Sequence, residues 1–312
     1  MKRVLAVLSM MLMVFALAGC GSQGTGDQGG TKKKIAILTP YLSSVTTNQM
    51  VEDLKTQAAN KNWETNVIDT KSDFGQLASR MEDVIATKVD AIVLVSADPN
   101  QVKTQIGEAA QKGIPVFGCD SGYIEGMTTN ATSDNVAMSK TITDYLFKQL
   151  GNKGNIIVLT HRPHPGVLKR TQELDSLLKE NTGIKVLTER QVEVPGPIEN
   201  ARKDMESLLL ANSAEDSISA VWAGWDEAAI GAAQAIEAAG RKNILVVGID
   251  GTSQAKDMIK KGSPLVATVE QNFSGMADIV IKQMDRVFQG QAAEGTELYA
   301  PATLITKDNV GQ

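Results

Sequence analysis

The feature that most constrains the fold is an alternation of short apolar runs with longer amphipathic segments, which the chain repeats in two sets. The apolar runs are rich in Val and Ile, which is typical of parallel strands buried on both faces. The longer segments carry apolar residues at helical spacing, as in 74–87, where Leu77, Met81, Val84 and Ile85 share one face. This alternation predicts parallel α/β sheets covered by helices on both faces.

The two sets cover about 34–131 and 133–270, with no glycine- and serine-rich run between them. Two closely joined α/β units of this kind leave a cleft between their strand ends. The predicted strands are 35–38, 66–69, 91–95, 114–117, 155–159, 185–190, 217–222, 244–249 and 265–269, with a short one near 127–130 and a final extended segment at 299–305. The predicted helices are 47–60, 74–87, 101–112, 136–149, 166–179, 198–210, 226–239, 253–260 and 273–288.

The N-terminus has the pattern of a targeting segment. A basic pair, Lys2-Arg3, precedes an apolar run that is shorter than the ~20 residues needed to span a bilayer as a helix. Leu17-Ala-Gly-Cys20 fits a lipoprotein signal, in which Cys20 is lipidated and becomes the new N-terminus; otherwise Cys20 is a small residue near a cleavage site. We expect a signal peptide at 1–19, a flexible linker at 20–33 and a domain held outside the cytoplasm by a lipid anchor, at the cell surface or in the periplasm.

Charge and cysteine content exclude some functions. The chain has 31 Lys and Arg against 36 Asp and Glu, and loss of the targeting segment would remove two of the basic residues. This acidic balance argues against nucleic acid as a partner. Cys119 lies at a predicted strand end without a paired His, so we expect a buried small residue rather than a nucleophile. No second long apolar run follows, so no transmembrane helix is expected.

Polar side chains collect at the carboxyl ends of the predicted strands, the edge at which open α/β sheets bind ligands. Asp250 directly follows the strand at 244–249, although it could also be a turn residue or a helix cap. Carboxylates and amides exchange hydrogen bonds with hydroxyl groups, and an aromatic face packs against the C–H side of a sugar ring. The set therefore suits a neutral polyhydroxylated ligand. Its other members are Thr39–Ser44, Ser96, Asp98, Asp120, Ser121, His161, Arg162, Trp225, Asp226, Glu270 and Gln271.

Several members of this set have a second interpretation. Asp98 precedes a proline and Asp226 starts a predicted helix, so each can be a helix cap. Trp222 lies inside a predicted strand and is expected in the core, whereas Trp225 follows that strand and is expected to contact the ligand.

Catalytic and metal-binding patterns are not found. His161-Arg162-Pro-His164 lacks a third partner at metal-ligand spacing, so His161 and Arg162 are expected at the ligand or in solvent. The sequence has no nucleophile elbow, phosphate loop or dinucleotide fingerprint. Asp226 and Asp250 could in principle act as an acid–base pair, but without a nucleophile or metal we expect a binding protein, not an enzyme, and no cofactor or metal.

Four stretches resemble, in order and spacing, the sugar-binding proteins of ABC importers of the ribose-binding type, the type I periplasmic binding proteins. They are Thr132–Asn135, Trp222–Gly231, Val246–Thr252 and Ala267–Gln271. The resemblance covers 34–306 and implies two doubly wound parallel-sheet domains joined by a three-strand hinge, with crossovers near 131–133, 270–271 and 299–302. The first domain would then comprise 34–131 plus 271–300, and the second 132–270 plus 301–312.

The resemblance also implies site residues. Asp120, Asp250 and Gln271 match positions that hydrogen-bond sugar hydroxyls. Trp225 replaces an asparagine and Ser121 an arginine of the ribose binders, and Thr46 lies near their stacking phenylalanines. Ribose itself is therefore in doubt, and another pentose, a hexose, a polyol or a modified sugar fits as well. The complete set of expected ligand contacts is Asp120, Asp250, Gln271, Trp225, Arg162, Tyr41, Ser43, Ser121, Thr46 and His161, with Tyr41 and Trp225 as the aromatic surface and Arg162 as the replacement guanidinium.

The function implied by the resemblance is a lipid-anchored solute receptor, monomeric, that closes on a sugar or polyol and delivers it to a membrane permease. Presentation of the ligand to a membrane sensor is the main alternative. A transcription regulator of the same fold would need an N-terminal helix-turn-helix in place of the predicted signal and linker, and a secreted sugar-processing enzyme would need turnover that no motif suggests.

Overall fold

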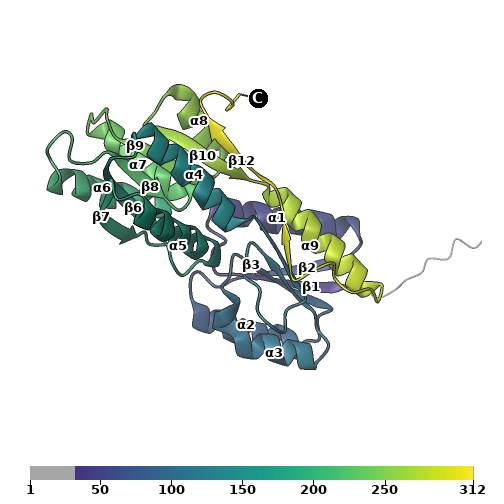
Figure 1. The fold of residues 1–312 in the computed structure, drawn as a ribbon. Coiled ribbons are helices and arrows are strands. Elements are labelled where there is room, and N and C mark those ends of the chain that lie inside the picture. The colour runs from purple at the N-terminus through teal and green to yellow at the C-terminus, as the bar shows by residue number, and fades with distance from the viewer. Residues whose placement is uncertain (1–31, 312) are drawn as a thin grey trace, which may run out of the picture. The chain divides into compact units, whose positions relative to one another are not determined.

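The computed structural model describes residues 32–311, and within them lie two six-stranded sheets (Figure 1). The predicted signal peptide, the lipidation at Cys20 and nearly all of the predicted linker lie outside these residues. Within 32–311, no helix combines the length and the apolar character that a membrane crossing requires.

The first sheet is parallel throughout, in the order β11-β5-β4-β3-β1-β2. Its central strand β3 is fully buried, as expected for an apolar run between two layers of helices. The strands are β1 (Lys34–Thr39), β2 (Glu64–Asp69), β3 (Ala91–Val95), β4 (Val116–Cys119), β5 (Thr129–Thr132) and β11 (Glu297–Tyr299).

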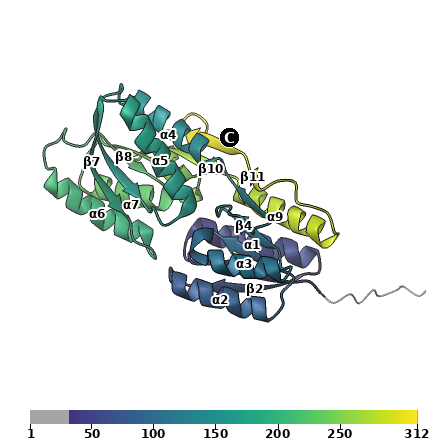
Figure 2. The same cartoon turned by 60° about the horizontal axis from the view of Figure 1, so that its bottom comes forward.

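Helices cover both faces of the first sheet, α1 (Val45–Asn60) and α9 (Phe273–Phe288) on one and α2 (Phe74–Ala86) and α3 (Lys103–Gln111) on the other (Figures 1 and 2). A short 3₁₀ turn, η1 (Pro99–Val102), precedes α3. Strand β1 shows the two-residue period: Ile35 and Ile37 pack with α1 and α9, whereas Ala36 and Leu38 pack with α2 and α3.

The second sheet has the order β12-β10-β9-β8-β6-β7, with only the edge strand β12 antiparallel to its neighbour among the pairs described. One core cluster joins this sheet to α6, α7 and α8, and another joins it to α4 and α5. The strands are β6 (Gly154–Thr160), β7 (Ile184–Gln191), β8 (Ala220–Ala223), β9 (Leu245–Asp250), β10 (Leu265–Gln271) and β12 (Ala302–Thr306). The helices are α4 (Asn135–Gln149), α5 (Pro165–Glu180), α6 (Pro197–Ala211), α7 (Asp226–Ala238) and α8 (Ser253–Lys261).

The chain passes between the two sheets from β5 to α4, from β10 to α9 and from β11 to β12. Helix α9 follows the second sheet in sequence, yet Met276 and Val280 pack in the core of the first. The single extended segment predicted at 299–305 is instead two strands, because the chain leaves the first sheet after Tyr299 and enters the second at Ala302.

Two core predictions are confirmed. Trp222 is fully buried, and its indole N–H donates to Thr143 Oγ1 at 3.0 Å. Cys119 is buried in the core of the first sheet, where burial raises the pKa of its thiol well above the usual value.

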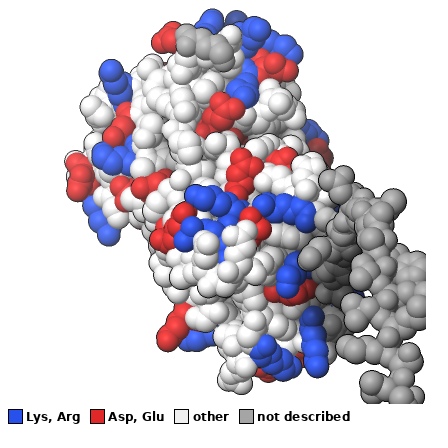
Figure 3. All heavy atoms as spheres, turned by 90° about the vertical axis from the view of Figure 1, so that its right-hand side faces the viewer, with Lys and Arg blue, Asp and Glu red and all other residues white. Residues whose placement is uncertain are grey.

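On the face shown in Figure 3, basic and acidic side chains lie beside one another, and neither sign forms an extended patch. Ion pairs between elements distant in sequence include Lys61 with Asp285, at 2.7 Å. Exposed pairs of this kind contribute little to stability.

Candidate functional site

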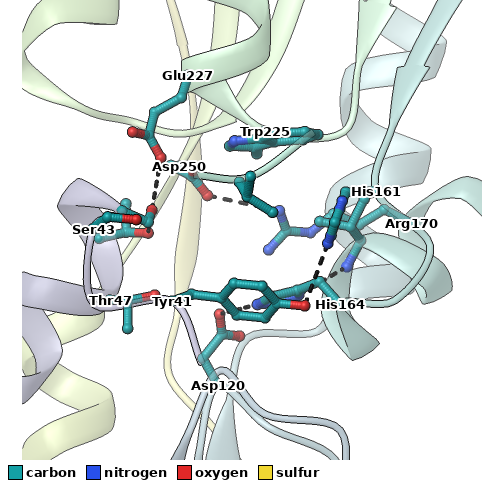
Figure 4. A pocket seen from close by; sticks show the side chains of 14 residues that line it. Tyr41, Ser43, Thr47, Asp120, His161, His164, Arg170, Trp225, Glu227 and Asp250 are labelled. Carbon is teal, nitrogen blue, oxygen red and sulfur yellow. Dashed lines mark hydrogen bonds and ion pairs between the residues drawn. The ribbon is translucent and has the colours of Figure 1, made fainter. Parts of the chain in front are cut away.

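The carboxyl ends of strands from both sheets meet at one cavity (Figure 4). The first sheet contributes the segment after β1 and the residue after β4. The second contributes residues that follow β6, β7 and β8, the last residue of β9 and part of α5. The space between the walls, including its opening to solvent, is about 520 Å³. The lining residues are Tyr41, Ser43, Ser44, Thr46, Thr47, Asp120, His161, His164, Val167, Arg170, Val194, Trp225, Glu227 and Asp250.

Arg170 on α5 places a buried guanidinium beside Asp250, the last residue of β9. Its Nη1 lies 3.6 Å from Asp250 Oδ1 and donates to the carbonyl oxygen of Gly224 at 2.9 Å. Its Nε donates to Asn135 Oδ1 at 2.7 Å. These bonds fix the plane of the guanidinium, so the positive charge is held rigidly at the cavity wall.

Burial raises the pKa of Asp250 well above the usual carboxyl range. Arg170 acts in the opposite direction, and the neighbouring carboxylate of Asp226 raises the pKa further. Asp226 lies behind the cavity wall, where its carboxylate accepts from the backbone N–H of Thr252 at 2.7 Å and from Thr268 Oγ1 at 2.6 Å. Asp226 is therefore not part of the lining, and it contacts Asp250 through its backbone N–H, which donates to Asp250 Oδ2 at 3.4 Å.

Asp120 follows β4 and faces the cavity from the first sheet. Its Oδ1 accepts from Thr132 Oγ1 at 3.2 Å. Burial raises the pKa of Asp120, while Arg170 and the bond from Thr132 act in the opposite direction. Carboxylates from both sheets thus share one guanidinium, an arrangement suited to accepting hydrogen bonds from a ligand held between the sheets.

Three aromatic rings form another part of the wall. The hydroxyl oxygen of Tyr41 lies 3.3 Å from His161 Nε2, and the rings of His161 and Trp225 meet edge to face at 6.3 Å between centroids. His161 Nδ1 lies 3.1 Å from the carbonyl oxygen of Val192. That carbonyl can only accept, so Nδ1 carries the proton and Nε2 accepts from the Tyr41 hydroxyl. Burial lowers the pKa of His161, which keeps this tautomer neutral.

His164 caps α5 and also lines the cavity. Its Nδ1 accepts from the backbone N–H groups of Gly166 and Val167, at 3.1 and 3.3 Å. The proton of the neutral ring therefore lies on Nε2, which is 3.8 Å from Asp120 Oδ2. Burial, the charge of Arg170 and nearby His161 lower the pKa of His164 to about 3.

His164 makes a pH-dependent contribution to stability. Because the folded-state pKa lies below the usual value near 6.5, its contribution is complete above pH 6.5 and is lost as the pH falls toward 3. Asn keeps a capping oxygen but does not titrate, so between pH 6 and 4 the unfolding free energy of His164→Asn should fall less steeply than that of the native protein, by about 1 kcal/mol per pH unit. Urea unfolding across this pH range measures the difference, and equal slopes would contradict it.

Glu227 in the first turn of α7 links the two walls directly. Its Oε2 accepts from Ser44 Oγ at 2.6 Å, across the cavity from the segment that follows β1 (Figure 4). Burial raises the pKa of this carboxyl group.

Comparison with known proteins gives the family. A family profile described as "Periplasmic binding protein domain" matches residues 35–292. The chain belongs to the periplasmic binding protein family. It shares 27% identity with the xylitol-binding protein of Mycolicibacterium smegmatis, over 99% of this chain and 87% of that protein. It shares 26% identity with the ribose import binding protein of Bacillus subtilis, over 98% of this chain and 100% of that protein.

Solved structures of ABC transporter solute-binding proteins have the same fold, the type I periplasmic binding protein fold predicted from the sequence. One from Agrobacterium vitis, with bound allitol, superposes with a TM-score of 0.85 at 26% identity and covers 90% of this chain and 97% of its own. Another, from Bacillus halodurans with bound myo-inositol, superposes with a TM-score of 0.82 at 26% identity. The match covers 92% of this chain and 98% of that protein.

In this periplasmic binding protein, most of the residues predicted for the site lie together. Tyr41, Ser43, Thr46, Asp120, His161, Trp225 and Asp250 line the cavity. Gln271 donates from Nε2 to Asp250 Oδ1 at 2.8 Å and lines an adjoining cavity that shares Thr46, Glu227 and Asp250 with the first.

Two predicted residues, Arg162 and Ser121, do not line this cavity. The guanidinium of Arg162 pairs with Glu189, at 2.7 and 2.8 Å, and with Asp175 at 3.2 Å. These carboxylates on β7 and α5 hold the side chain outside the lining. Ser121 is buried, and its hydroxyl donates to the carbonyl oxygen of Ala97 rather than lining the cavity.

Arg170, His164 and Glu227 line the cavity but were not among the residues predicted from the sequence. Arg170 had a signal in the sequence, because it lies with Val167 and Leu174 on the buried face of a helix, where a charge needs a partner.

Asp98 is a helix cap, since its carboxylate accepts from the backbone N–H of Asn100 at 3.0 Å. Among residues 32–311, no group of His, Cys, Asp and Glu side chains could hold a metal ion.

Proposed function

We propose that this protein captures a sugar or sugar-like polyol in the cavity between its sheets and delivers it to the permease of an ABC importer. The observation that carries the proposal is the placement of Asp120 from one sheet and Asp250 with Arg170 from the other around a single cavity with aromatic walls. Relatives named for xylitol and ribose, and similar structures with bound allitol and myo-inositol, support the same class of ligand.

Charged acceptors can supply the affinity. A hydrogen bond from a hydroxyl group to a carboxylate contributes about 1.5–3 kcal/mol. Two or three such bonds, from residues such as Asp120 and Asp250, make up much of the ~8 kcal/mol of a micromolar complex. Trp225 and Tyr41 add an apolar surface for the C–H groups of the ligand.

Ligand release and capture require the cavity to open, and the three chain passages between the sheets are the natural hinge. We propose two domains on either side of this hinge, 34–131 with 271–300 and 132–270 with 301–312. Because both sheets supply lining residues, the ligand binds the closed form more tightly and shifts the population toward it. The permease would then recognise the closed form.

The proposed cellular setting follows from the lipoprotein signal pattern. The mature chain would begin at Cys20, remain outside the cytoplasm on a lipid anchor and act as a monomer. Presentation of the bound sugar to a membrane sensor stays the alternative to transport, and no observation on the described residues favours it.

Tryptophan emission tests the position of the ligand. Trp225 lines the cavity, whereas Trp222 is fully buried in the core of the second sheet. A ligand found in a thermal-shift screen of xylitol, ribose, allitol, apiose and myo-inositol should raise the unfolding temperature and change the emission spectrum. Trp225→Phe should remove most of that change in emission.

The control is Trp63→Phe, because Trp63 packs against Phe288, with the ring centroids 5.1 Å apart, and does not line the cavity. This variant should keep the ligand-induced change. The ligand-binding proposal fails if no sugar or polyol of the screen, extended to other pentoses and hexoses, stabilises the protein.

A further inference from the structure

The cavity lining holds more carboxyl groups than cationic side chains. Three lining residues of the described chain are carboxylates, Asp120, Asp250 and Glu227, each 5% exposed or less. The one Lys or Arg in the same lining is Arg170. The two histidines add no positive charge, because each has one ring nitrogen that accepts a hydrogen bond within the protein.

The two cationic side chains near the carboxyl groups, Arg170 and Lys256, already have partners within the protein. Arg170 donates to Asn135 and Gly224 in addition to facing Asp250. Lys256, which lines the adjoining cavity, pairs with Glu270 at 2.6 Å. Glu227 makes no ion pair within residues 32–311; its carboxylate accepts from the hydroxyl of Ser44 and from the backbone N–H of Val45, both of them neutral donors.

Gln271 adds an acceptor that lacks a donor. Its side chain is 5% exposed, and its Oε1 has no hydrogen-bond partner within residues 32–311. With Asp250 ionised, this orientation of the amide is favoured, because the reversed amide would place Oε1 against the carboxylate oxygen of Asp250 that Nε2 now contacts at 2.8 Å. A buried acceptor of this kind calls for a donor from outside residues 32–311.

These acceptors lie around one region. Glu227 and Asp250 line both cavities, and Gln271 lines the second of them. We propose that this region, the acceptor corner of Glu227, Asp250 and Gln271, binds the ammonium group of an amine-bearing sugar or polyol. The inference rests on the proposed function and assigns the ligand class within it.

The chemistry of an ammonium group fits the acceptor corner. It carries three N–H donors and one positive charge, whereas a hydroxyl offers a single donor and no charge. Hydrogen bonds with charge on both partners are stronger than those with charge on one. The carboxylate of a sugar acid would instead meet Asp250 and Glu227 without a free cation, so acids should be rejected.

The test compares charge states on a common skeleton. The probes are glucose, glucosamine, N-acetylglucosamine and glucuronate; xylitol, 1-amino-1-deoxyxylitol and xylonate; and myo-inositol with an inosamine. Calorimetric titration at pH 7 should give, for at least one skeleton, an amine that binds about tenfold or more tightly than its neutral parent, with no detectable binding of the acid. N-acetylation, which keeps the nitrogen but removes the charge, should abolish the preference.

The variant Glu227→Gln tests whether the acceptor corner causes the preference for amine over neutral ligands. Glu227→Gln keeps an oxygen that can accept from Ser44 but removes the charge, so the ratio of amine to neutral affinity should fall by about tenfold. Glu237→Gln, an exposed change on the same helix α7, is the matched control and should keep the native ratio.

The outcomes separate this inference from the proposed function. Neutral parents that bind as tightly as their amines on every skeleton would overturn the inference and leave sugar binding standing. An unchanged ratio in Glu227→Gln would also overturn it, because the ammonium would then lie elsewhere. If neither neutral nor amine probes bind, the proposed function fails together with the inference.

Discussion

Arg170→Met should lower the free energy of unfolding at pH 7.5 by about 3–5 kcal/mol and abolish ligand binding. Met fills a similar volume, so the loss comes from charge. The native guanidinium is 1% exposed and compensates Asp250 at 3.6 Å, as well as the more distant Asp120. Without it, two buried carboxylates face each other, and Asn135 and Gly224 lose their donor.

Urea unfolding at two pH values identifies the cause. The pKa values of Asp120 and Asp250 are raised, so their destabilising ionisation disappears as the pH falls toward their ordinary range, and the loss in Arg170→Met should be smaller at pH 5 than at pH 7.5. Arg170→Met combined with Asp250→Asn should recover part of the stability. Arg80→Met, which removes an exposed guanidinium from α2, is the control and should change stability little. A loss that does not depend on pH would contradict the electrostatic explanation.

Local patterns predicted the fold well because each element carries its own periodicity. The bounds of α9 agree with those predicted, since Phe273 and Phe288 delimit a segment with a clear apolar face. Strand β9 and the Asp250-Gly251 break that follows it were also predicted, because a β-branched run ends there. The edge at which the sheets bind ligands then follows from parallel topology alone, which explains why seven predicted residues lie in the cavity.

The partner of each arginine could not be predicted from local pattern, although the buried helix face of Arg170 indicated that it needs one. Arg162 follows β6 closely and was expected at the ligand or in solvent, but it pairs with Glu189 and Asp175 outside the cavity lining. Which carboxylate an arginine meets is decided by how the elements pack against one another, here α5 and β7, which carry Asp175 and Glu189. Arg170 shows the reverse case, since only the packing of α5 brings it to Asp250. Glu227 was missed for the same reason, because its contact with Ser44 joins opposite walls.

Asp250→Asn should weaken ligand binding without lowering the free energy of unfolding. The carboxylate of Asp250 is 5% exposed, and its pKa is raised by burial and by Asp226 despite Arg170. A raised pKa means that the ionised form destabilises the folded state above the ordinary carboxyl range, increasingly so as the pH rises. Asn removes this cost and still accepts from Gln271, while Asp120 remains to compensate Arg170. The ligand-free variant should therefore be at least as stable as the native protein at pH 8.

Binding should change in the opposite direction. A neutral amide accepts a ligand hydroxyl group more weakly than a carboxylate, by about 1–2 kcal/mol, so the ligand found by thermal shift should bind Asp250→Asn about 10- to 30-fold more weakly. Calorimetry and urea unfolding at pH 8 measure the two effects, and Asp257→Asn, an exposed change on α8, should alter neither. Native affinity in Asp250→Asn would remove Asp250 from the site. A large loss of stability would instead mean that its charge holds Arg170 in place, and that the negative charge of the cavity serves the fold rather than the ligand.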